Sequence, residues 1–345
     1  MNRGAKVKVA GAGAMGLSCA LALADAGCRV EVFDPADPFF ANASGVAAGM
    51  LAPGFEAVLD AAARPHFDLL MASRNAWPSL AQRAGLTLER SGALAAGRTE
   101  WIAQLAGRFT TLGLHATDLP RNTAEALAPG LSPDIEAILM TREDWRLDAR
   151  QALADLRRAA DAAGVQFRQE VADGRGDADV LVVATGAAGG LAHEAPELTG
   201  LEPIKGHILQ AACTDLTAVT VRGEGIYVTP TAAGLAIGAT METGVDDPAV
   251  DPARTGPLLA AGARVFPALA QAPHQAFAGV RAATPDGLPL VGPSQAEGVF
   301  LAVGARRNGW LLAPLAAQVI AAQVTGRDPG AYSGRLDPRR FTRPG

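Results

Sequence analysis

Residues 7–34 read "VKVAGAGAMGLSCALALADAGCRVEVFD", and this stretch decides the fold. Alternating apolar residues predict a strand, a glycine-rich turn follows, an alanine- and leucine-rich run predicts a helix, and a second strand pattern closes the stretch. Gly11 permits the tight turn, Gly13 lets a pyrophosphate approach the backbone, and Gly16 lets the helix pack closely on the strand. Asp34 follows Gly13 by 21 residues, where a carboxylate accepts hydrogen bonds from ribose hydroxyls. We therefore predict a unit that binds a dinucleotide at the helix N-terminus.

Two other interpretations explain this opening less well. Basic residues followed by an apolar run resemble a secretory signal, but a signal peptide explains neither the fixed glycine offsets nor the second strand. A glycine-rich surface turn does not explain Asp34. Whether the dinucleotide is NAD or FAD stays open at this point, because both use this unit.

Later segments favour FAD. "ASGVAAGMLAP" (residues 43–53) is a run of small residues, with Ser44 among them, suited to backbone lying flat against a cofactor. "DADVLVVATGAAGG" (residues 177–190) predicts a buried strand that ends at Thr185 and Gly186, where a doubly wound sheet forms its ligand crevice. This strand comes about 150 residues after the first unit, which implies a sheet interrupted by a second domain.

Composition limits the classes of function. A chain of 345 residues with 49% hydrophobic and 19% charged residues has the composition of a globular protein of two domains. The net charge of -5 argues against nucleic acid as the main partner. No apolar run suits a membrane span. The three cysteines and five histidines have no metal-ligand or redox spacing, so we expect no metal and a reduced, cytoplasmic setting.

The remaining patterns complete a fold class. Residues 60–163 predict mostly helices, including an amphipathic helix over 148–164, and residues 199–245 predict strands. We expect an α/β protein in which a doubly wound Rossmann-type FAD-binding domain is interleaved with an α+β substrate domain on a mainly antiparallel sheet. The expected FAD-binding parts are residues 1–75, 146–198 and 276–345, and the expected substrate-domain parts are residues 76–145 and 199–275.

Several motifs together resemble one family. They are "GAGAMG", "AAGML", "PIKG", "YVTP", "GATME", "GVRAATPDGLPLVG" and "GARRNGWLLAP". In this order they resemble the D-amino-acid oxidase family of FAD-dependent amine oxidases, and within it most closely the glycine oxidases of thiamine biosynthesis. The resemblance runs from about residue 6 to about residue 326 and is weakest over residues 60–145.

The resemblance implies that FAD is bound noncovalently. It implies that Ala14, Met15 and Asp34 contact the adenosine end, with Val171 at the adenine side. Ala48, Gly49 and Met50 would lie along the flavin, and residues 305–311 would form the loop and helix start at the flavin ring. The full set of expected cofactor-binding residues is Gly11, Gly13, Ala14, Met15, Gly16, Asp34, Ser44, Ala48, Gly49, Met50, Val171, Thr185, Gly186, Ala305, Arg306, Arg307, Asn308, Gly309, Trp310 and Leu311.

The resemblance also implies a substrate site. Arg281 matches the arginine that holds the substrate carboxylate, and Tyr227 matches a tyrosine beside it. Met50 and Met241 are further expected substrate contacts, and Arg307 is the third expected catalytic residue. A guanidinium suits this role because it holds a carboxylate through two parallel hydrogen bonds. Two alternatives stay open: Arg281 as a structural arginine paired with an acid, and Tyr227 as an ordinary sheet tyrosine.

The sequence departs from the family at one place. Related oxidases usually carry histidine and an aromatic residue where this chain has Ala305 and Arg306, which changes the expected pocket. The following "RNGW" stretch predicts a helix start whose free amides, together with the charge of Arg307, favour negative charge on a reduced flavin.

These patterns predict an FAD-dependent oxidase of glycine and other small amines, such as sarcosine and small D-amino acids. Oxygen would be reduced to hydrogen peroxide, and the imine would supply the thiazole of thiamine. The expected partners are a small amino acid and oxygen, with homo-oligomerisation left open. The alternatives are a D-amino-acid or sarcosine-type dehydrogenase with another electron acceptor, and a flavin-binding protein without catalysis.

Overall fold

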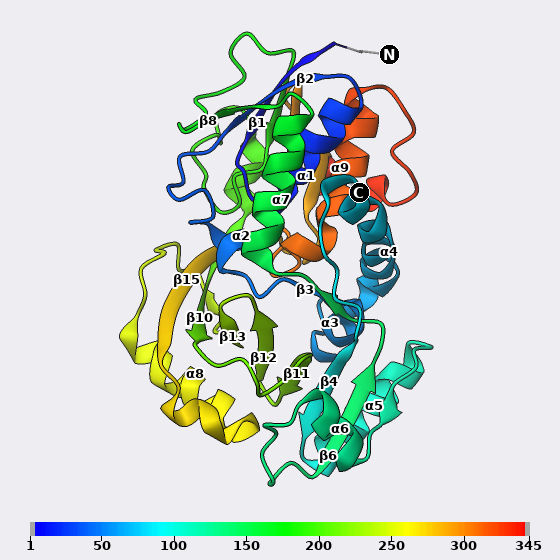
Figure 1. Cartoon of the computed structure of the whole chain (residues 1–345). Helices are drawn as coiled ribbons and strands as arrows, with labels where there is room; N and C mark the ends of the chain where they lie inside the picture. The colour runs from blue at the N-terminus through cyan, green and yellow to red at the C-terminus, as the bar shows by residue number, and fades with distance from the viewer. Residues whose placement is uncertain (1–3, 342–345) are drawn as a thin grey trace.

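The structure is a computed structural model that describes residues 4–341. It contains a six-stranded sheet in the upper half of Figure 1 and a nine-stranded sheet in the lower half. The order of the first sheet is β16-β17-β9-β1-β2-β8. Its strands are β1 (Lys6–Ala10), β2 (Arg29–Phe33), β8 (Gln166–Arg168), β9 (Val180–Val183), β16 (Leu290–Pro293) and β17 (Val299–Val303). All neighbours run parallel except β16 and β17, which gives a doubly wound sheet with one antiparallel edge strand.

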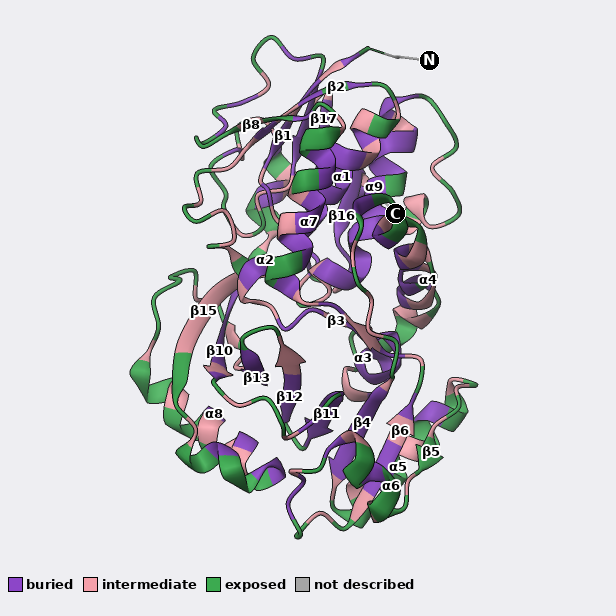
Figure 2. Ribbon diagram, in the orientation of Figure 1, coloured by how far each residue is buried: buried purple, intermediate pink, exposed green. Residues whose placement is uncertain are grey.

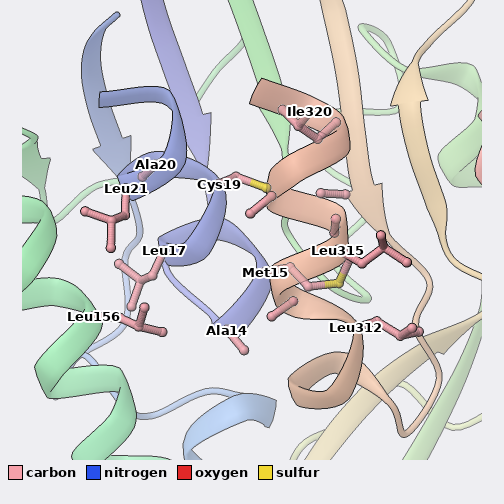
Figure 3. Close-up of a cluster of buried hydrophobic side chains, with 14 of the residues drawn as sticks. Ala14, Met15, Leu17, Cys19, Ala20, Leu21, Leu156, Leu312, Leu315 and Ile320 are labelled. Atoms are coloured by element: carbon pink, nitrogen blue, oxygen red, sulfur yellow. The ribbon is translucent and has the colours of Figure 1, made fainter. Parts of the chain in front are cut away.

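Helices cover one face of this first sheet. They are α1 (Ala14–Asp25), α4 (Phe67–Ala84), α7 (Ala149–Ala162) and α9 (Gly309–Val324). Figure 3 shows α1 between α7 and α9, with Leu17 facing Leu156 of α7 and Met15 beside Leu315 of α9. Cys19 is completely buried in the same cluster, and burial raises the pKa of its thiol to about 12. Cys19 is therefore an inert packing residue.

The strand, turn, helix and strand expected from residues 7–34 are present as β1, α1 and β2. Val7 and Val9 of β1 pair in register with Val30 and Val32 of β2, and all four side chains are buried in the core beneath α1. On the opposite face, Leu181 of β9 packs in a second cluster, to which irregular segments after β8 and β9 contribute. The sheet is thus buried on both faces, as a parallel sheet requires.

The second sheet is mainly antiparallel, as predicted. Eight of its strands follow the order β14-β10-β13-β12-β11-β4-β6-β5, and β15 pairs with β10 outside that path. The strands are β4 (Ala93–Gly97), β5 (Thr117–Asp118), β6 (Ala137–Thr141), β10 (Glu202–Ala211), β11 (Thr220–Gly223), β12 (Ile226–Thr231), β13 (Gly234–Gly238), β14 (Glu242–Thr243) and β15 (His274–Ala283). Only the β11–β4 pair among these is parallel within the described residues.

Three helices flank the second sheet: α5 (Thr99–Thr111), α6 (Arg121–Leu127) and α8 (Pro252–Val265). Figure 2 shows exposed residues on the outer sides of these helices. Leu258 of α8 is buried in one cluster with Val228 of β12 and Ile237 of β13, so α8 closes the outer face of the sheet. The inner face is left for the site.

Short elements join the two halves of the molecule. They are α2 (Ala43–Val46), β3 (Met50–Leu51), α3 (Pro53–Leu59) and β7 (Trp145–Arg146). β3 and β7 pair with each other, and Figure 1 shows β3 and α3 lying between the halves. The remaining elements are α10 (Ser333–Leu336) and single 3-10 turns at Arg64–His66, Pro196–Gly200, Pro267–Gln271 and Pro338–Phe341.

The expectation that residues 60–163 are mostly helical was incomplete. The segment contains α4 to α7, but it also contributes β4 and β6 to the second sheet. β4 reads "ALAAG", a composition with low strand propensity. Pairing with β6 on one side and β11 on the other makes it a strand, so long-range contacts override the local preference.

The expected domain boundaries stay a prediction. The one at residues 275 and 276 falls at the start of β15, which pairs with β10 as far as Ala283. Within residues 4–341, no helix combines the length and apolar character that crossing a membrane demands.

Candidate active site

A first cavity, the nucleotide groove, opens where β1, β2 and β9 end and α1 begins. It has a volume of about 220 Å³. Small residues form most of its wall. The expected cofactor-binding residues that line it are Gly11, Gly13, Ala14, Met15, Asp34, Ser44, Thr185, Gly186, Ala305, Arg306, Arg307, Gly309 and Trp310.

The three glycines of the turn have three different surroundings. Gly11 has a φ of +107°, and a Cβ atom there would overlap the carbonyl group of Ala184. A Cβ atom at Gly16 would overlap the Gly11 carbonyl oxygen, so Gly16 permits the close helix packing. A Cβ atom at Gly13 would meet only the Ser44 side chain, at 3.0 Å from its Oγ. The backbone of Gly13 therefore faces the open groove, where a phosphate needs close approach.

Polar groups fix the shape of the groove. The Ala14 amide donates to Ser44 Oγ over 3.0 Å, and the Trp310 indole donates to the Ser44 carbonyl over 3.0 Å. The Asp34 carboxylate accepts from the amides of Ala12 at 2.6 Å and Ala36 at 2.8 Å. Each carboxylate oxygen has a further acceptor site, so Asp34 is oriented by the turn and can still accept from a bound ribose.

A second space, the amine-side cavity, lies against the inner face of the second sheet. Its volume is about 370 Å³, within the range of small-ligand sites. Ala48, Gly49 and Met50 line it, together with Met241 from the segment after β13. The residues that line both cavities are Ala43, Ala47, Arg281, Arg307 and Trp310.

The two spaces together fit an extended dinucleotide. One end offers the glycine turn and the N-terminus of α1, which favour phosphates. The middle, around Ala43 and Ala47, is lined by small side chains, and the far end carries arginines. The donor set and the open space at Gly13 fit FAD.

Arg281 projects into this far end from β15. It pairs in register with Ile204 of β10, and its guanidinium lies over Gly206, where a Cβ atom would overlap it. Its Nη1 donates to the Thr240 carbonyl over 3.4 Å. Among residues 4–341, no Asp or Glu lies within ion-pair distance of Arg281, which removes the alternative of a structural arginine paired with an acid. Burial lowers the pKa of this guanidinium, Tyr227 partly offsets that effect, and Arg307 lowers the pKa further.

Tyr227 lies on β12 between partners on two neighbouring strands. It pairs in register with Arg222 of β11 and with Gly238 of β13, and its hydroxyl lies over Gly238, where a Cβ atom would overlap it. Burial raises the pKa of the Tyr227 hydroxyl, although Arg281 and Arg222 lower it in part. The hydroxyl therefore stays protonated at neutral pH and can donate a hydrogen bond.

Two carboxylates that the sequence did not point to, Glu56 and Asp60, face the arginines. Arg307 donates to Glu56 over 2.6 Å and lies 3.1 Å from Asp60. Arg306 is paired with Asp60 as well. Burial acts to lower the pKa of Arg307, but the two carboxylates outweigh it and the pKa is raised. The expectation of a free positive charge at the start of α9 therefore needs correction, because Glu56 and Asp60 offset the charge of Arg307.

A remote carboxylate holds the helix that carries Glu56. Asp144 accepts from the amides of Gly54 at 2.7 Å and Phe55 at 3.0 Å, and so caps the N-terminus of α3. Asp144 is almost completely buried, and that burial raises its pKa to about 6 although both amide bonds and Arg222 act to lower it. Its position, far along the chain from α3, gave no sequence signal.

The structure brings most of the expected site residues together, but not all. Gly16, Val171 and Leu311 line neither cavity. Val171 is 73% exposed, and its expected place at the adenine side stays a prediction. Leu311, in the first turn of α9, is buried in the hydrophobic core. The sequence indicated none of Glu56, Asp60 and Asp144, and it did not indicate Arg222, which lines the amine-side cavity.

Comparisons with known proteins agree with this geometry. The profile of the DAO family, described as FAD dependent oxidoreductase, matches residues 6–323. The bifunctional protein ThiO/ThiG of Synechocystis sp. is 29% identical over 370 residues, which are 99% of this chain and 55% of that protein. A protein of Rhizobium etli assigned as the thiamine biosynthesis oxidoreductase ThiO is 31% identical over 335 residues, covering 92% of this chain and 96% of that one.

The fold has a solved counterpart as well. The crystal structure of glycine oxidase from Geobacillus kaustophilus superimposes with a TM-score of 0.84 at 26% sequence identity, covering 97% of this chain and 99% of that one. The chain spans about half the length of the bifunctional relative and nearly the whole of the other two proteins.

Proposed function

The chain belongs to the DAO family of FAD-dependent oxidoreductases, and we propose that it oxidises glycine and other small amines, with oxygen as the electron acceptor. Its relatives support FAD-dependent oxidation of the glycine oxidase type. The observation that carries the proposal is Arg281. It is a half-buried arginine that lines both the amine-side cavity and the nucleotide groove, and no carboxylate of the described residues pairs with it.

The overall reaction balances without another reactant. The substrate loses a hydride equivalent from Cα and a proton from nitrogen, so that the C–N single bond becomes an imine. Oxygen takes up the two electrons and two protons to give hydrogen peroxide, and water converts a released imine to glyoxylate and ammonia. FAD, when bound, supplies the two-electron acceptor between amine and oxygen.

The residues of the chain provide binding and orientation. Arg281 holds the substrate carboxylate by parallel hydrogen bonds, and the protonated Tyr227 hydroxyl donates a further one. Both are fixed on paired strands, over Gly206 and Gly238, so the carboxylate has one position. The lining of the amine-side cavity includes no histidine. This fits a substrate whose amine arrives neutral and needs no side-chain base.

Fixing the carboxylate also selects a stereochemistry. With the carboxylate on Arg281 and the Cα–H directed at the cofactor at a distance of about 3–3.5 Å, the amine and side chain have one place each. Glycine has no side chain and avoids the restriction. We expect oxidation of glycine and sarcosine, a weaker reaction with D-alanine, and none with L-alanine.

Peroxide formation with these four compounds tests the proposal. Oxidation of D-amino acids with an artificial dye but not with oxygen would instead favour a dehydrogenase. No reaction with any amine, although FAD is bound, would leave a flavin-binding protein without catalysis. The ThiO relatives suggest a purpose for the imine, namely supply of the thiazole of thiamine. That role is tested by complementation of a strain that lacks its own glycine oxidase and grows only with added thiazole.

A further inference from the structure

Arg222 is a second arginine in the amine-side cavity, and the proposed reaction of glycine does not use it. Its residue is 7% exposed. Its Nε and Nη2 are buried and have no hydrogen-bond partner among the described residues. Arginine stays charged at any pH a protein tolerates, and a buried charge without hydrogen bonds is costly. Arg222 therefore presents donors that the folded chain leaves unused.

The nearest carboxylate does not satisfy these donors. Glu56 Oε1 lies 3.6 Å from Arg222 Nη2, beyond the distance of a normal hydrogen bond. The other oxygen of Glu56 accepts from Arg307 over 2.6 Å. Glu56 therefore binds mainly Arg307, and it neutralises the charge of Arg222 only in part.

The sheet directs Arg222 toward the same space as Arg281. Arg222, Tyr227 and Gly238 are consecutive partners across β11, β12 and β13, and residues directly opposite each other project from the same face. The Arg222 guanidinium lies 5.7 Å from the centre of the Tyr227 ring. Arg281 approaches from the other side, over Gly206 of β10. The two guanidiniums therefore face the cavity from opposite sides of Tyr227.

The hydrogen bonds around this space are incomplete for a substrate with one carboxylate. Glu56 and Asp60 pair with Arg306 and Arg307. Among the described residues, Arg222 has only the 3.6 Å approach of Glu56 and the more distant charge of Asp144. A single substrate carboxylate on Arg281 leaves the Nε and Nη2 donors of Arg222 without an acceptor.

We propose that Arg222 binds a second carboxylate of the substrate, so that the preferred substrates are small amines with two carboxylates. The second group is either on the side chain, as in D-aspartate, or on the nitrogen, as in iminodiacetate. In both cases Arg281 holds the carboxylate next to the oxidised carbon, and the bond that is oxidised is unchanged. This inference rests on the proposed function, because it extends the same cavity and the same reaction.

The test measures peroxide formation by the holoenzyme with glycine, D-aspartate and iminodiacetate. We expect at least one dicarboxylate to exceed glycine in kcat/KM by about tenfold or more. In Arg222→Met the ratio of kcat/KM for that dicarboxylate to kcat/KM for glycine should fall about 10- to 150-fold, the loss expected for hydrogen bonds to a charged group. Arg222→Lys keeps the charge without the planar fork and should give an intermediate ratio. Arg83→Met removes an exposed arginine of α4 that pairs with Asp25 of α1 and lines neither cavity, and it should leave the ratio unchanged.

A second measurement needs no turnover. Titration of the holoenzyme with succinate and with acetate, followed by flavin absorbance, should show tighter binding of succinate, and Arg222→Met should remove that preference. Equal ratios in the wild type and in Arg222→Met, with glycine still oxidised, would overturn the inference and leave the proposed function standing. If no amine is oxidised at all, the proposed function fails, and equal binding of succinate and acetate would then overturn the role of Arg222 on its own.

Discussion

The nucleotide groove and the amine-side cavity share five lining residues, yet they are built in different ways. The groove depends on backbone: glycines, small side chains and a helix N-terminus, which come from residues 11–47, 184–187 and 280–310. The amine-side cavity depends on long charged side chains brought together from α3, β11, β15 and the start of α9. A turn that needs glycines at fixed positions can be recognised from a short stretch of sequence. Ion pairs between distant segments cannot be recognised in this way.

The largest expected effect tests the groove. Gly13→Val should abolish FAD binding, because the side chain would occupy the space that the pyrophosphate needs. Gly13 has a φ of -74°, so valine fits the backbone and the protein should still fold. The measurement is the flavin absorbance of the purified variant, together with the flavin released on denaturation.

Gly16 and Gly107 serve as controls for this substitution. Gly16→Val should instead destabilise the fold, since its Cβ atom would overlap the Gly11 carbonyl oxygen. Gly107 has open space around the Cβ position, and Gly107→Val should keep its FAD. Retention of flavin by Gly13→Val would show that the nucleotide groove is not part of the cofactor site.

The second-largest effect is expected for a substitution in the amine-side cavity. Arg281→Met should weaken binding of the substrate carboxylate by about 1.5–3 kcal/mol, the value for hydrogen bonds to a charged group. Most of this should appear as a raised KM, with FAD content unchanged. Steady-state kinetics with glycine measure it, and wild-type kinetics in the variant would mean that another residue holds the carboxylate.

Replacing Asp144 should have a smaller effect, a change in the stability of the protein that depends on pH. Its folded pKa of about 6 exceeds the value of about 3.9 for an unfolded chain. Below pH 6 the folded state binds a proton more tightly than the unfolded state, so this group makes the protein more stable as the pH falls toward 4. Relative to Asp144→Asn, the wild-type holoenzyme should gain about 1–2 kcal/mol between pH 7.5 and pH 5.

Thermal unfolding at the two pH values measures this difference. Carboxylates whose pKa is lowered by arginines, such as Asp60, stay ionised across this window. A stability difference between wild type and Asp144→Asn that is the same at both pH values would show that Asp144 is not protonated in this range.

The smallest effect is expected for a substitution in the nucleotide groove. Ser44→Ala removes the acceptor of the Ala14 amide and should weaken FAD binding by about 0.5–1.5 kcal/mol, the net value of one hydrogen bond. Flavin dissociation constants of wild type and variant test this. A loss as large as that of Gly13→Val would mean that Ser44, and not the open space at Gly13, decides binding.

The sequence therefore predicted the two halves of the site unequally. Gly11, Gly13, Gly16 and Asp34 could be assigned because their spacing follows from the geometry of one turn. The resemblance supplied Arg281 and Tyr227, which residue chemistry alone left open. Glu56 and Asp60 were missed because nothing in "PGFEAVLD" marks those acids as partners of an arginine pair some 250 residues later.

Residues 60–163, which were expected to be mostly helical, show that long-range contacts limit the prediction of the fold as well. β4 is a strand because it pairs with β11 and β6, and β6 is a strand because it pairs with β4. The local sequences of these two strands could not predict them. Arg306 was expected to alter the pocket, and in the structure it pairs with Asp60. That outcome could not be foreseen without α3 in place.

We expect a small amine to be oxidised while Arg281 holds its carboxylate. Anaerobic mixing of the holoenzyme with glycine or with glycinamide, followed by flavin absorbance, tests this expectation. Glycinamide keeps the amine and the carbon but has no carboxylate. Glycine should bleach the flavin, and glycinamide at the same concentration should not, while Arg281→Met should need far more glycine for the same bleaching. Equal bleaching by both compounds, or none by glycine, would contradict this expectation.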